Sequence, residues 1–376
     1  MKSITNNITI DISYEKWYNF IKVMKRGISM VKNNPFTLMY GIPASSTIDR
    51  NDAINTITKS FLYSDNMFMY LITGIRGTGK TVLLRKTADY FSKEKNWIVI
   101  DLNPQGQIIS SLANNLCVQS KIKKLIEGWS ISFNLPYVTI SKEPAQTISD
   151  PEIVATTIIE NLAKQKKKIL ITIDEVNNTK ELKEFANFYQ AILGKSMPVY
   201  LLMTGLKENI NSIINDKAMT FLTRSPKIEL EPLGLPSIAI EYQNIFDINK
   251  ETAVEMAKLT NGYAFAYQVL GFLFFESEKR TLDRDFIKQY DTYLWNNGYN
   301  KFWCDLTHTE KEFVMALAQS VSGSREDIIG SAFSKTNYTK YRQRLLEKGI
   351  IKNDGYNKLS FVLPRFKEFI EYAKEF

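Results

Sequence analysis

The sequence predicts an α/β fold followed by a helical region and a C-terminal winged helix-turn-helix. Short apolar runs alternate with helical stretches as far as about Leu230, which is typical of a parallel sheet covered by helices on both faces. The strand signal ends past Pro236, and only helical patterns continue from there. From about Thr307 the patterns indicate three helices and then a hairpin, which is the order of elements in a winged helix-turn-helix.

These patterns divide the 376 residues into four segments. Domains usually hold about 100–200 residues, so a chain of this length has room for two or three. We expect a helical extension at residues 1–34, an α/β domain at 35–235, a helical lid at 236–300 and a winged-helix domain at 301–376. Within the extension, apolar spacing near 3.6 predicts an amphipathic helix over Tyr14–Val31.

Several apolar runs have the length of buried strands. They lie at Phe68–Thr73, Trp97–Leu102, Ile169–Ile173, Val199–Thr204 and Lys227–Leu230. The less regular region between the second and third runs predicts an inserted hairpin, with strands at Ser130–Phe133 and Tyr137–Ser141. In the lid, the patterns predict helices at Ile238–Phe246, Glu251–Thr260, Ala264–Glu276 and Arg284–Trp295.

The composition argues against several classes of protein. No apolar run approaches the ~20 residues that span a bilayer, and the N-terminus has no secretory leader, so we expect a cytoplasmic protein without a membrane partner. Two cysteines and one histidine are too few for a disulfide framework, a zinc cluster or a histidine-based triad. The formal charge of +8 favours polyanionic partners, either nucleic acid or a nucleotide, without deciding between them.

The stretch Gly74-Ile75-Arg76-Gly77-Thr78-Gly79-Lys80-Thr81 lies between the first strand and a helix that begins near Val82. It fits the pattern G-x-x-x-x-G-K-[ST] of a phosphate-binding loop. Its glycines let the backbone wrap around a phosphate, toward which the loop N–H groups and the helix N-terminus point. Lys80 then reaches the β- and γ-phosphates, and Thr81 ligates Mg²⁺. We therefore expect ATP or ADP with Mg²⁺, held by these eight residues and Val82.

Two carboxylates follow the apolar strand that ends at Ile173. A buried parallel strand presents the residues at its C-terminal end to the ligand crevice. Asp174 is therefore the candidate Mg²⁺ ligand, and Glu175 is the candidate general base that polarises the attacking water.

Thr204 ends the next strand, where a polar side chain is able to hold the water beside the γ-phosphate; an ordinary strand-end threonine is the alternative. Arg224 precedes the last strand and is a candidate finger that stabilises charge at the site of a neighbouring copy. A plain surface arginine is the alternative for that position.

On the predicted helix Asn337–Lys348, one side carries an apolar stripe, and the other carries Lys340 and Arg344, with Arg342 and Gln343 at its edges. Together with Lys358 of the hairpin, these side chains suit a helix that reads a DNA groove. A basic, solvated face on a domain used for protein contacts has the same pattern, so duplex DNA and a protein partner both remain open.

The run from Ile72 to Leu84, the strand end Ile173-Asp174-Glu175 and Thr204-Gly205-Leu206 resemble the AAA+ ATPases of the origin-recognition and STAND-related group. Residues 34–50, Thr260–Tyr263 and 346–364 are similar to prokaryotic, archaeal-type members with a C-terminal winged helix. The resemblance implies a sheet in the order 5-1-4-3-2 and a nucleotide between sheet and lid. It also implies that Arg50 and Ile42 lie around the base or ribose.

The lid departs from that group at Gly262-Tyr263-Ala264. The STAND pattern Gly-x-Pro appears without its proline, and the arginine that serves standard AAA+ members as a second sensor is missing from this helix start. Some members of the group couple hydrolysis to oligomerisation, whereas others act as switches locked by their nucleotide.

The sequence thus predicts an ATP-hydrolysing AAA+/STAND-related switch that couples its nucleotide state to a C-terminal winged helix and associates with DNA. Assembly into a homo-oligomer and binding to a protein partner both remain open. The alternative is a nucleotide-gated protein-interaction switch, in signalling or defence, with little hydrolysis and no DNA binding. A small-molecule kinase is a weaker third interpretation, because the sequence contains no motif for binding a phosphate acceptor.

Overall fold

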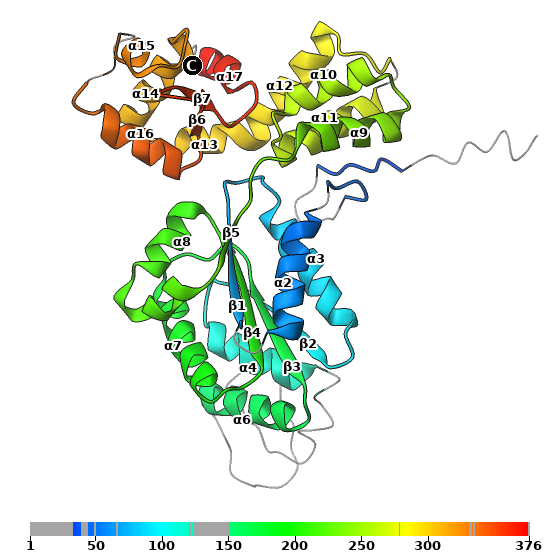
Figure 1. Ribbon diagram of the computed structural model, residues 1–376, viewed down its shortest axis with the longest axis vertical. Coiled ribbons are helices and arrows are strands. Elements are labelled where there is room, and N and C mark those ends of the chain that lie inside the picture. The colour runs from blue at the N-terminus through cyan, green and yellow to red at the C-terminus, as the bar shows by residue number, and fades with distance from the viewer. Residues whose placement is uncertain are drawn as a thin grey trace, which may run out of the picture. The chain divides into compact units, whose positions relative to one another are not determined.

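The computed structural model describes residues 33–38, 44–48, 50–64, 67–119, 122, 150–277, 279–330, 333 and 335–374 (Figure 1). The chain separates into two units, Met1–Pro35 and Phe36–Phe376, and the helices and strands described here belong to the second. The helix expected at Tyr14–Val31 and the hairpin expected at Ser130–Phe133 and Tyr137–Ser141 lie outside the described residues.

A parallel sheet forms the centre of the α/β domain, as its apolar runs predict. Its strands are β1 (Met69–Thr73), β2 (Trp97–Leu102), β3 (Lys168–Ile173), β4 (Val199–Gly205) and β5 (Lys227–Glu229). They are hydrogen-bonded in the order β2-β3-β4-β1-β5, with Met69 opposite Leu201 and Ile171 opposite both Ile100 and Leu201. The predicted order 5-1-4-3-2 is confirmed.

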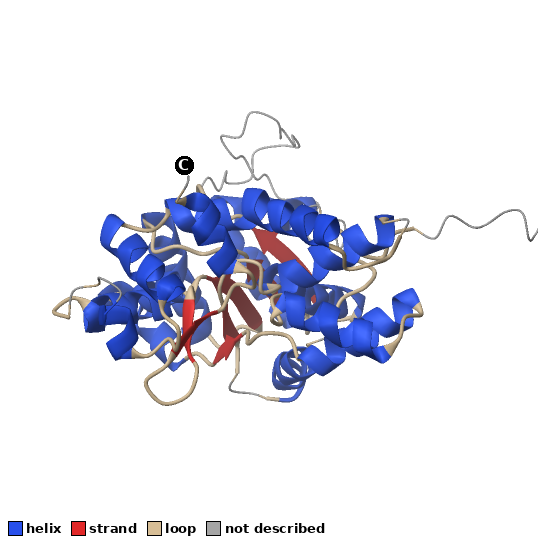
Figure 2. Cartoon of the chain, turned by 90° about the horizontal axis from the view of Figure 1, so that it is seen from above, coloured by secondary structure: helices blue, strands red, loops and turns tan. Residues whose placement is uncertain are grey.

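Successive strand residues face opposite sides of the sheet, so each face has its own core. Tyr70, Ile72 and Tyr200 face α2 (Asn51–Tyr63) and α3 (Lys80–Lys93). Met69 and Leu71 belong to the opposite core, built with α4 (Ile108–Val118), α6 (Pro151–Lys164), α7 (Lys180–Gly194), α8 (Lys207–Ile214) and η1 (Lys217–Arg224). In Figure 2 the strands lie among helices, as expected for a sheet covered on both faces.

The lid contains the four predicted helices. They are α9 (Leu235–Phe246), α10 (Lys250–Thr260), α11 (Ala264–Glu276) and α12 (Arg284–Leu294). The chain continues through η2 (Trp295–Tyr299) and α13 (Asn300–Cys304), which the sequence patterns did not predict. Proline at the start of α9 and Asn249 and Asp283 as side-chain caps explain where three of these helices begin.

The C-terminal region, defined here as residues 305–374, has the predicted order of three helices and a hairpin. Its elements are α14 (His308–Gln319), α15 (Arg325–Gly330), α16 (Tyr338–Glu347), the antiparallel pair β6 (Ile351–Asn353) and β7 (Leu359–Phe361), and the unpredicted α17 (Phe366–Ala373). Thr307 and Glu310 form a capping box at α14. Tyr338 and Leu345 of the predicted apolar stripe are buried.

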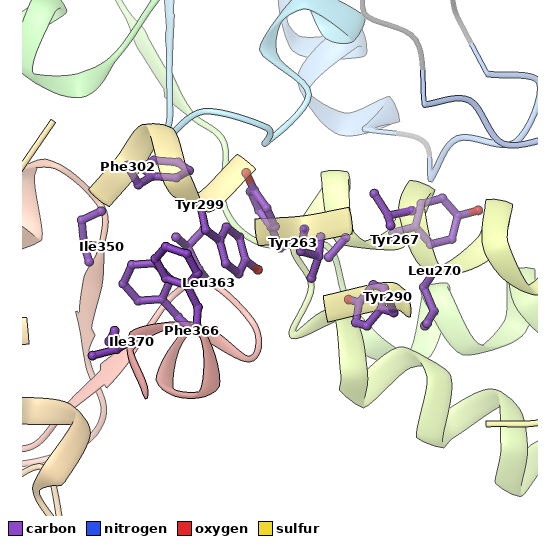
Figure 3. Packing of buried hydrophobic residues seen from close by; sticks show 14 of the residues in the cluster. Tyr263, Tyr267, Leu270, Tyr290, Tyr299, Phe302, Ile350, Leu363, Phe366 and Ile370 are labelled. Atoms are coloured by element: carbon purple, nitrogen blue, oxygen red, sulfur yellow. The ribbon is translucent and has the colours of Figure 1, made fainter. Parts of the chain in front are cut away.

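The lid and the C-terminal region share a single hydrophobic core (Figure 3). Tyr299 and Phe302 pack with Phe366, and the Tyr299 hydroxyl donates a 2.7 Å hydrogen bond to the carbonyl of Pro364. A buried ion pair joins Asp291 of α12 to Arg365. This core is continuous across residue 300, the boundary expected between the lid and the winged-helix domain.

Phe36, Leu38 and Ile48 pack on the core of the lid and the C-terminal region, although the sequence assigned this stretch of chain to the α/β domain. The Phe36 ring is 3% exposed, and it stacks at 5.7 Å on Phe246 and meets Tyr267 edge-on. Gln268 binds both flanks of this segment, since its Oε1 accepts from Thr37 N and its Nε2 donates to Ser46 O. The chain therefore contacts the lid before it enters the sheet.

Every helix among the described residues is too short or too polar to span a bilayer.

Candidate nucleotide-binding site

The glycine loop, residues 74–79, connects β1 to α3 at the carboxyl edge of the sheet. Gly77 and Gly79 have φ values of +74° and +91°, a region that L side chains rarely adopt. A Cβ at Gly79 would meet nothing, so only its backbone conformation requires glycine there. At Gly77 a Cβ would also collide with the Tyr263 ring.

Lys80 is folded back onto this loop. Its ammonium donates to the carbonyls of Gly74, at 3.0 Å, and Ile75, at 2.8 Å. The side chain is 7% exposed. Burial lowers the pKa of Lys80 to about 8, and the nearby carboxylates of Glu175 and Asp174 oppose that shift. The Lys80 ammonium thus lies at the glycine loop, close to the candidate acidic residues Asp174 and Glu175.

The carbonyls of residues 74–78 all accept hydrogen bonds. Besides the two from Lys80, Arg76 O accepts from the Tyr263 hydroxyl at 2.9 Å, and Gly77 O accepts from Phe265 N at 3.1 Å. The Arg50 guanidinium donates to Thr78 O at 3.1 Å. Carbonyl oxygens repel anions, so hydrogen bonds that engage these carbonyls suit a loop that binds a phosphate through its N–H groups.

Thr81 and Asp174 meet at the base of this loop. The Thr81 hydroxyl, in the first turn of α3, donates a 2.7 Å hydrogen bond to Asp174 Oδ2 at the end of β3. A hydroxyl and a carboxylate are hard oxygen donors, and Mg²⁺ is usually held by only one or two such protein groups together with phosphate oxygens and water. The two residues present therefore fit the predicted metal.

Thr204 holds the end of β3 in place. Its hydroxyl donates to Asp174 Oδ1, in a short hydrogen bond, and accepts from Glu175 N at 3.1 Å. Thr204 is fully buried, and its hydroxyl is thus engaged with the two acidic residues. Glu175 has a φ of +56°, a strained conformation for a residue with a side chain, and its side chain is exposed.

The remaining nucleotide candidates lie in different places. Arg50 precedes α2 and contacts the loop backbone; burial lowers its pKa, and Glu231 opposes that shift. Val82 is 36% exposed on the first turn of α3. Ile42 lies outside the described residues. Arg224 is exposed at the end of η1, where the chain enters β5 and therefore at the opposite edge of the sheet from the glycine loop.

The C-terminal region also contacts the glycine loop. Ile75 packs so closely on Gly349, whose φ is +67°, that a Cβ on that glycine would overlap the Ile75 side chain. The Arg76 Nη2 lies 4.0 Å from Asp305 Oδ2. A cavity of about 180 Å³ lies beside these contacts, lined by Ile75 and Arg76, by Leu206–Glu208 after β4, and by residues of the C-terminal region. Sequence patterns gave no signal for these long-range contacts.

The candidate DNA-binding residues gather on and beside α16. Lys340 and Arg344 are exposed one turn apart, and both lie over the Tyr341 ring, at 5.5 and 5.4 Å. Gln343 is exposed and donates to Glu347. Arg342 is less available, because its guanidinium donates a 2.7 Å hydrogen bond to Asn353 of the hairpin. Lys358 is exposed at the start of β7.

Comparison with known proteins supports an ATPase domain of this kind. Residues 48–200 match the model of an ATPase domain found predominantly in Archaea, which includes the glycine loop and Asp174. Residues 297–370 match a domain of unknown function (DUF8462). No curated protein matches the chain in sequence.

Several solved structures are similar to this chain over most of its length. The Aeropyrum pernix ORC2 protein, in ADPNP and ADP complexes, is 12% identical over 91% of this chain and 98% of its own, with a TM-score of 0.56. Cdc6p from Pyrobaculum aerophilum is 14% identical over 90% and 97%, with a TM-score of 0.47. The A. pernix ORC1 protein in complex with DNA is 14% identical over 87% and 92%, with a TM-score of 0.43. The first of these shows that the chain shares the fold of the A. pernix ORC2 protein.

Proposed function

We propose that this chain, which carries an archaeal-type ATPase domain on an origin-recognition-type P-loop fold, binds and hydrolyses ATP. The observation that supports it best is the convergence of five residues from three elements. Lys80 and Thr81 at the start of α3, Asp174 and Glu175 after β3, and Thr204 on β4 are connected by hydrogen bonds or by charge at the edge where the glycine loop leaves the sheet.

Each residue then has a defined task. The loop N–H groups and Lys80 bind the phosphates, while Thr81 and Asp174 would hold Mg²⁺, which supplies charge neutralisation at the phosphates when bound. Glu175 accepts a proton from the attacking water. Thr204 keeps Asp174 and Glu175 in register through its hydroxyl. Arg224, exposed and remote from its own glycine loop, would serve a neighbouring copy if the chain assembles.

We further propose that the nucleotide state moves the lid and the C-terminal region together, because they share one core. The exposed pair Lys340 and Arg344, with Gln343, would then contact duplex DNA, with Arg342 and Lys358 flanking them. Each phosphate contact releases counterions, so the affinity should fall steeply with salt. Lys340→Ala and Arg344→Ala should each lower the salt slope by about 1, whereas Lys250→Ala on the lid should leave it unchanged.

Steady-state ATP hydrolysis, measured over a range of protein concentrations with and without duplex DNA, tests the proposal. Lys80→Ala should abolish ATP binding, and Glu175→Gln should bind ATP without turning it over. Turnover that rises with protein concentration and with DNA would support an assembling, DNA-linked ATPase in which Arg224 acts between copies. Activity that persists in both variants would contradict the proposed site.

A nucleotide-gated protein-interaction switch is the second candidate, and one contact favours it. The C-terminal region rests on the glycine loop through Gly349 and Ile75, and through Asp305 and Arg76, so this region is able to respond to the loop without any DNA. Tight ATP binding with negligible turnover, and no retention on duplex DNA at low salt, would favour this candidate over the first.

A further inference from the structure

The turn between α10 and α11 of the lid touches the glycine loop at two successive peptide groups. The Tyr263 hydroxyl donates to Arg76 O at 2.9 Å, and the backbone N–H of Phe265 donates to Gly77 O at 3.1 Å. Tyr263 is 4% exposed, so its hydroxyl is sheltered from water. In Figure 3 its oxygen lies at the margin of the labelled side chains, pointing away from Tyr290 and Leu270.

The same turn is fixed to the segment that joins β5 to the lid. Leu233 N donates to Gly262 O at 2.8 Å. Gly262 has a φ of +74°, and a Cβ on it would lie 2.5 Å from Leu233 O, so a side chain has no room there. Residues 262–265 therefore connect the glycine loop, the β5–α9 segment and the start of α11. A change in the loop backbone would therefore be transmitted to the lid through this turn.

The two bonds set the orientation of two peptide planes. In a trans peptide the carbonyl and the following N–H point in opposite directions. Holding Arg76 O and Gly77 O toward the lid turns the N–H groups of Gly77 and Thr78 away from it. These N–H groups belong to the part of the loop that the proposed function assigns to the phosphates, and an anion is favoured where N–H groups converge.

We propose that Tyr263 is a positioning residue for ATP, through which the lid holds the glycine loop in its phosphate-binding arrangement. The inference rests on the proposed nucleotide site. It assigns to a tyrosine hydroxyl and a backbone carbonyl the coupling between lid and nucleotide, in a turn that has neither the proline nor the arginine expected from the family resemblance. Gly77 fits the same arrangement, since any side chain there would displace the Tyr263 ring.

Tyr263→Phe tests the proposal because it removes one hydroxyl and leaves the ring. The matched control is Tyr242→Phe, since the Tyr242 hydroxyl is also buried in the lid and donates a 2.7 Å hydrogen bond to a carbonyl, that of Tyr267, which is not part of the glycine loop. The dissociation constants of ATP and ADP, the melting temperature, and hydrogen–deuterium exchange in the peptide that covers residues 74–81 are measured for both variants. Lys80→Ala serves as the variant that abolishes binding.

We expect Tyr263→Phe to weaken ATP binding about three- to tenfold and to speed exchange in the loop peptide. Tyr242→Phe should lower the melting temperature at least as much without changing either quantity. The proposal for Tyr263 would be overturned, and the proposed nucleotide site would stand, if Tyr263→Phe binds ATP as tightly as the unmodified protein or more tightly while Lys80→Ala does not bind it. If the unmodified protein fails to bind ATP, the proposed function is wrong. Unchanged hydrogen–deuterium exchange of the loop peptide in Tyr263→Phe would reject the positioning role of Tyr263.

Discussion

Thr81 and Asp174, 93 positions apart in the chain, are joined by a 2.7 Å hydrogen bond between the hydroxyl of α3 and a carboxylate oxygen at the end of β3. This bond requires the first turn of α3, which follows β1, to lie close to the end of β3. The strand order allows this, because only β4 lies between β1 and β3. The two proposed Mg²⁺ ligands are therefore adjacent in the structure.

Asp174→Asn keeps the shape of the side chain but removes the charge that attracts a divalent cation. We expect ATP binding in the presence of Mg²⁺ to weaken by about tenfold or more, and binding in EDTA to change little. Titrations of ATP with and without Mg²⁺ measure both. Asp101→Asn is the matched control, because Asp101 accepts a hydrogen bond from Thr172 in the neighbouring strand pair. An equal loss of affinity in EDTA would contradict the role of Asp174 as a metal ligand.

Lys80 predicts how ATP binding depends on pH. Its pKa of about 8 lies below the ordinary lysine value of 10.5, because burial disfavours the charged form. A bound phosphate favours that form, so ATP binding near pH 8 should take up a proton, and affinity should fall as the pH rises past 8. Calorimetric titrations in two buffers of different ionisation enthalpy measure the uptake.

The lowered pKa of Lys80 also makes the stability of the fold depend on pH. Between about pH 8 and 10.5 the unfolded chain keeps the Lys80 proton and the folded chain releases it, so this residue makes the free energy of unfolding rise with pH in that window. Lys80→Arg stays charged throughout and should show neither proton uptake nor this slope. Equal proton uptake by Lys80→Arg would assign the titration to another group.

Gly349 provides a test of the contact between the C-terminal region and the glycine loop. Its φ is +67°, and a Cβ would overlap Ile75, whereas Gly355, with φ of +84°, has nothing within 4 Å. Both glycine-to-alanine changes incur the cost of a left-handed residue, roughly 1–2 kcal/mol. Only Gly349→Ala adds the overlap, which typically costs ~1–3 kcal/mol more.

Urea unfolding of the two variants measures this difference, and a second substitution tests its cause. Ile75→Ala should restore part of the loss in Gly349→Ala, since it removes the atoms that overlap, and should restore nothing in Gly355→Ala. Equal losses for the two glycine variants, or no rescue by Ile75→Ala, would mean that the C-terminal region does not rest on the glycine loop in solution.

The sequence predicts those parts of the fold that depend on local patterns. The five strands and four lid helices have apolar spacing that repeats along a short stretch of chain, and their observed bounds differ from the expected ones by no more than three residues, the largest difference being at the start of α9. The motif around Lys80 was also recognisable, because its glycines and lysine must follow one another in order. The sheet order required the family resemblance as well.

Features that depend on packing between distant segments could not be predicted. Phe36 is an ordinary apolar residue in a turn-rich segment, and its sequence neighbours do not indicate that its ring packs against Gly271 of the lid. In the sequence, Tyr263 is only part of a departure from the family pattern, whereas in the structure its hydroxyl donates a hydrogen bond to Arg76 O. Arg342 shares its helix with Lys340 and Arg344, but the hairpin places Asn353 where it binds this arginine alone.

Asp291 and Arg365 predict how firmly the lid is joined to the C-terminal region. The Arg365 Nη2 lies 2.6 Å from Asp291 Oδ2, its Nε also binds this carboxylate, and Asp291 is 6% exposed. Asp291→Asn removes the buried charged partner of a half-buried guanidinium and leaves only the more exposed Glu368. Removing one member of a fully buried pair costs ~3–5 kcal/mol, and we expect about 2 kcal/mol here because a quarter of the Arg365 side chain, 25%, is exposed.

Glu368→Gln is the matched control, since Glu368 also pairs with Arg365, at 3.1 Å, but is 42% exposed. Water and salt screen such a pair, so this change should alter the free energy of unfolding by less than about 0.5 kcal/mol. Urea unfolding followed by tryptophan fluorescence reports on the packing between the lid and the C-terminal region, because Trp295 and Trp303 both pack on Phe369 of α17. If Asp291→Asn changes stability no more than Glu368→Gln does, the ion pair does not fasten the lid to the C-terminal region, and the common core alone joins them.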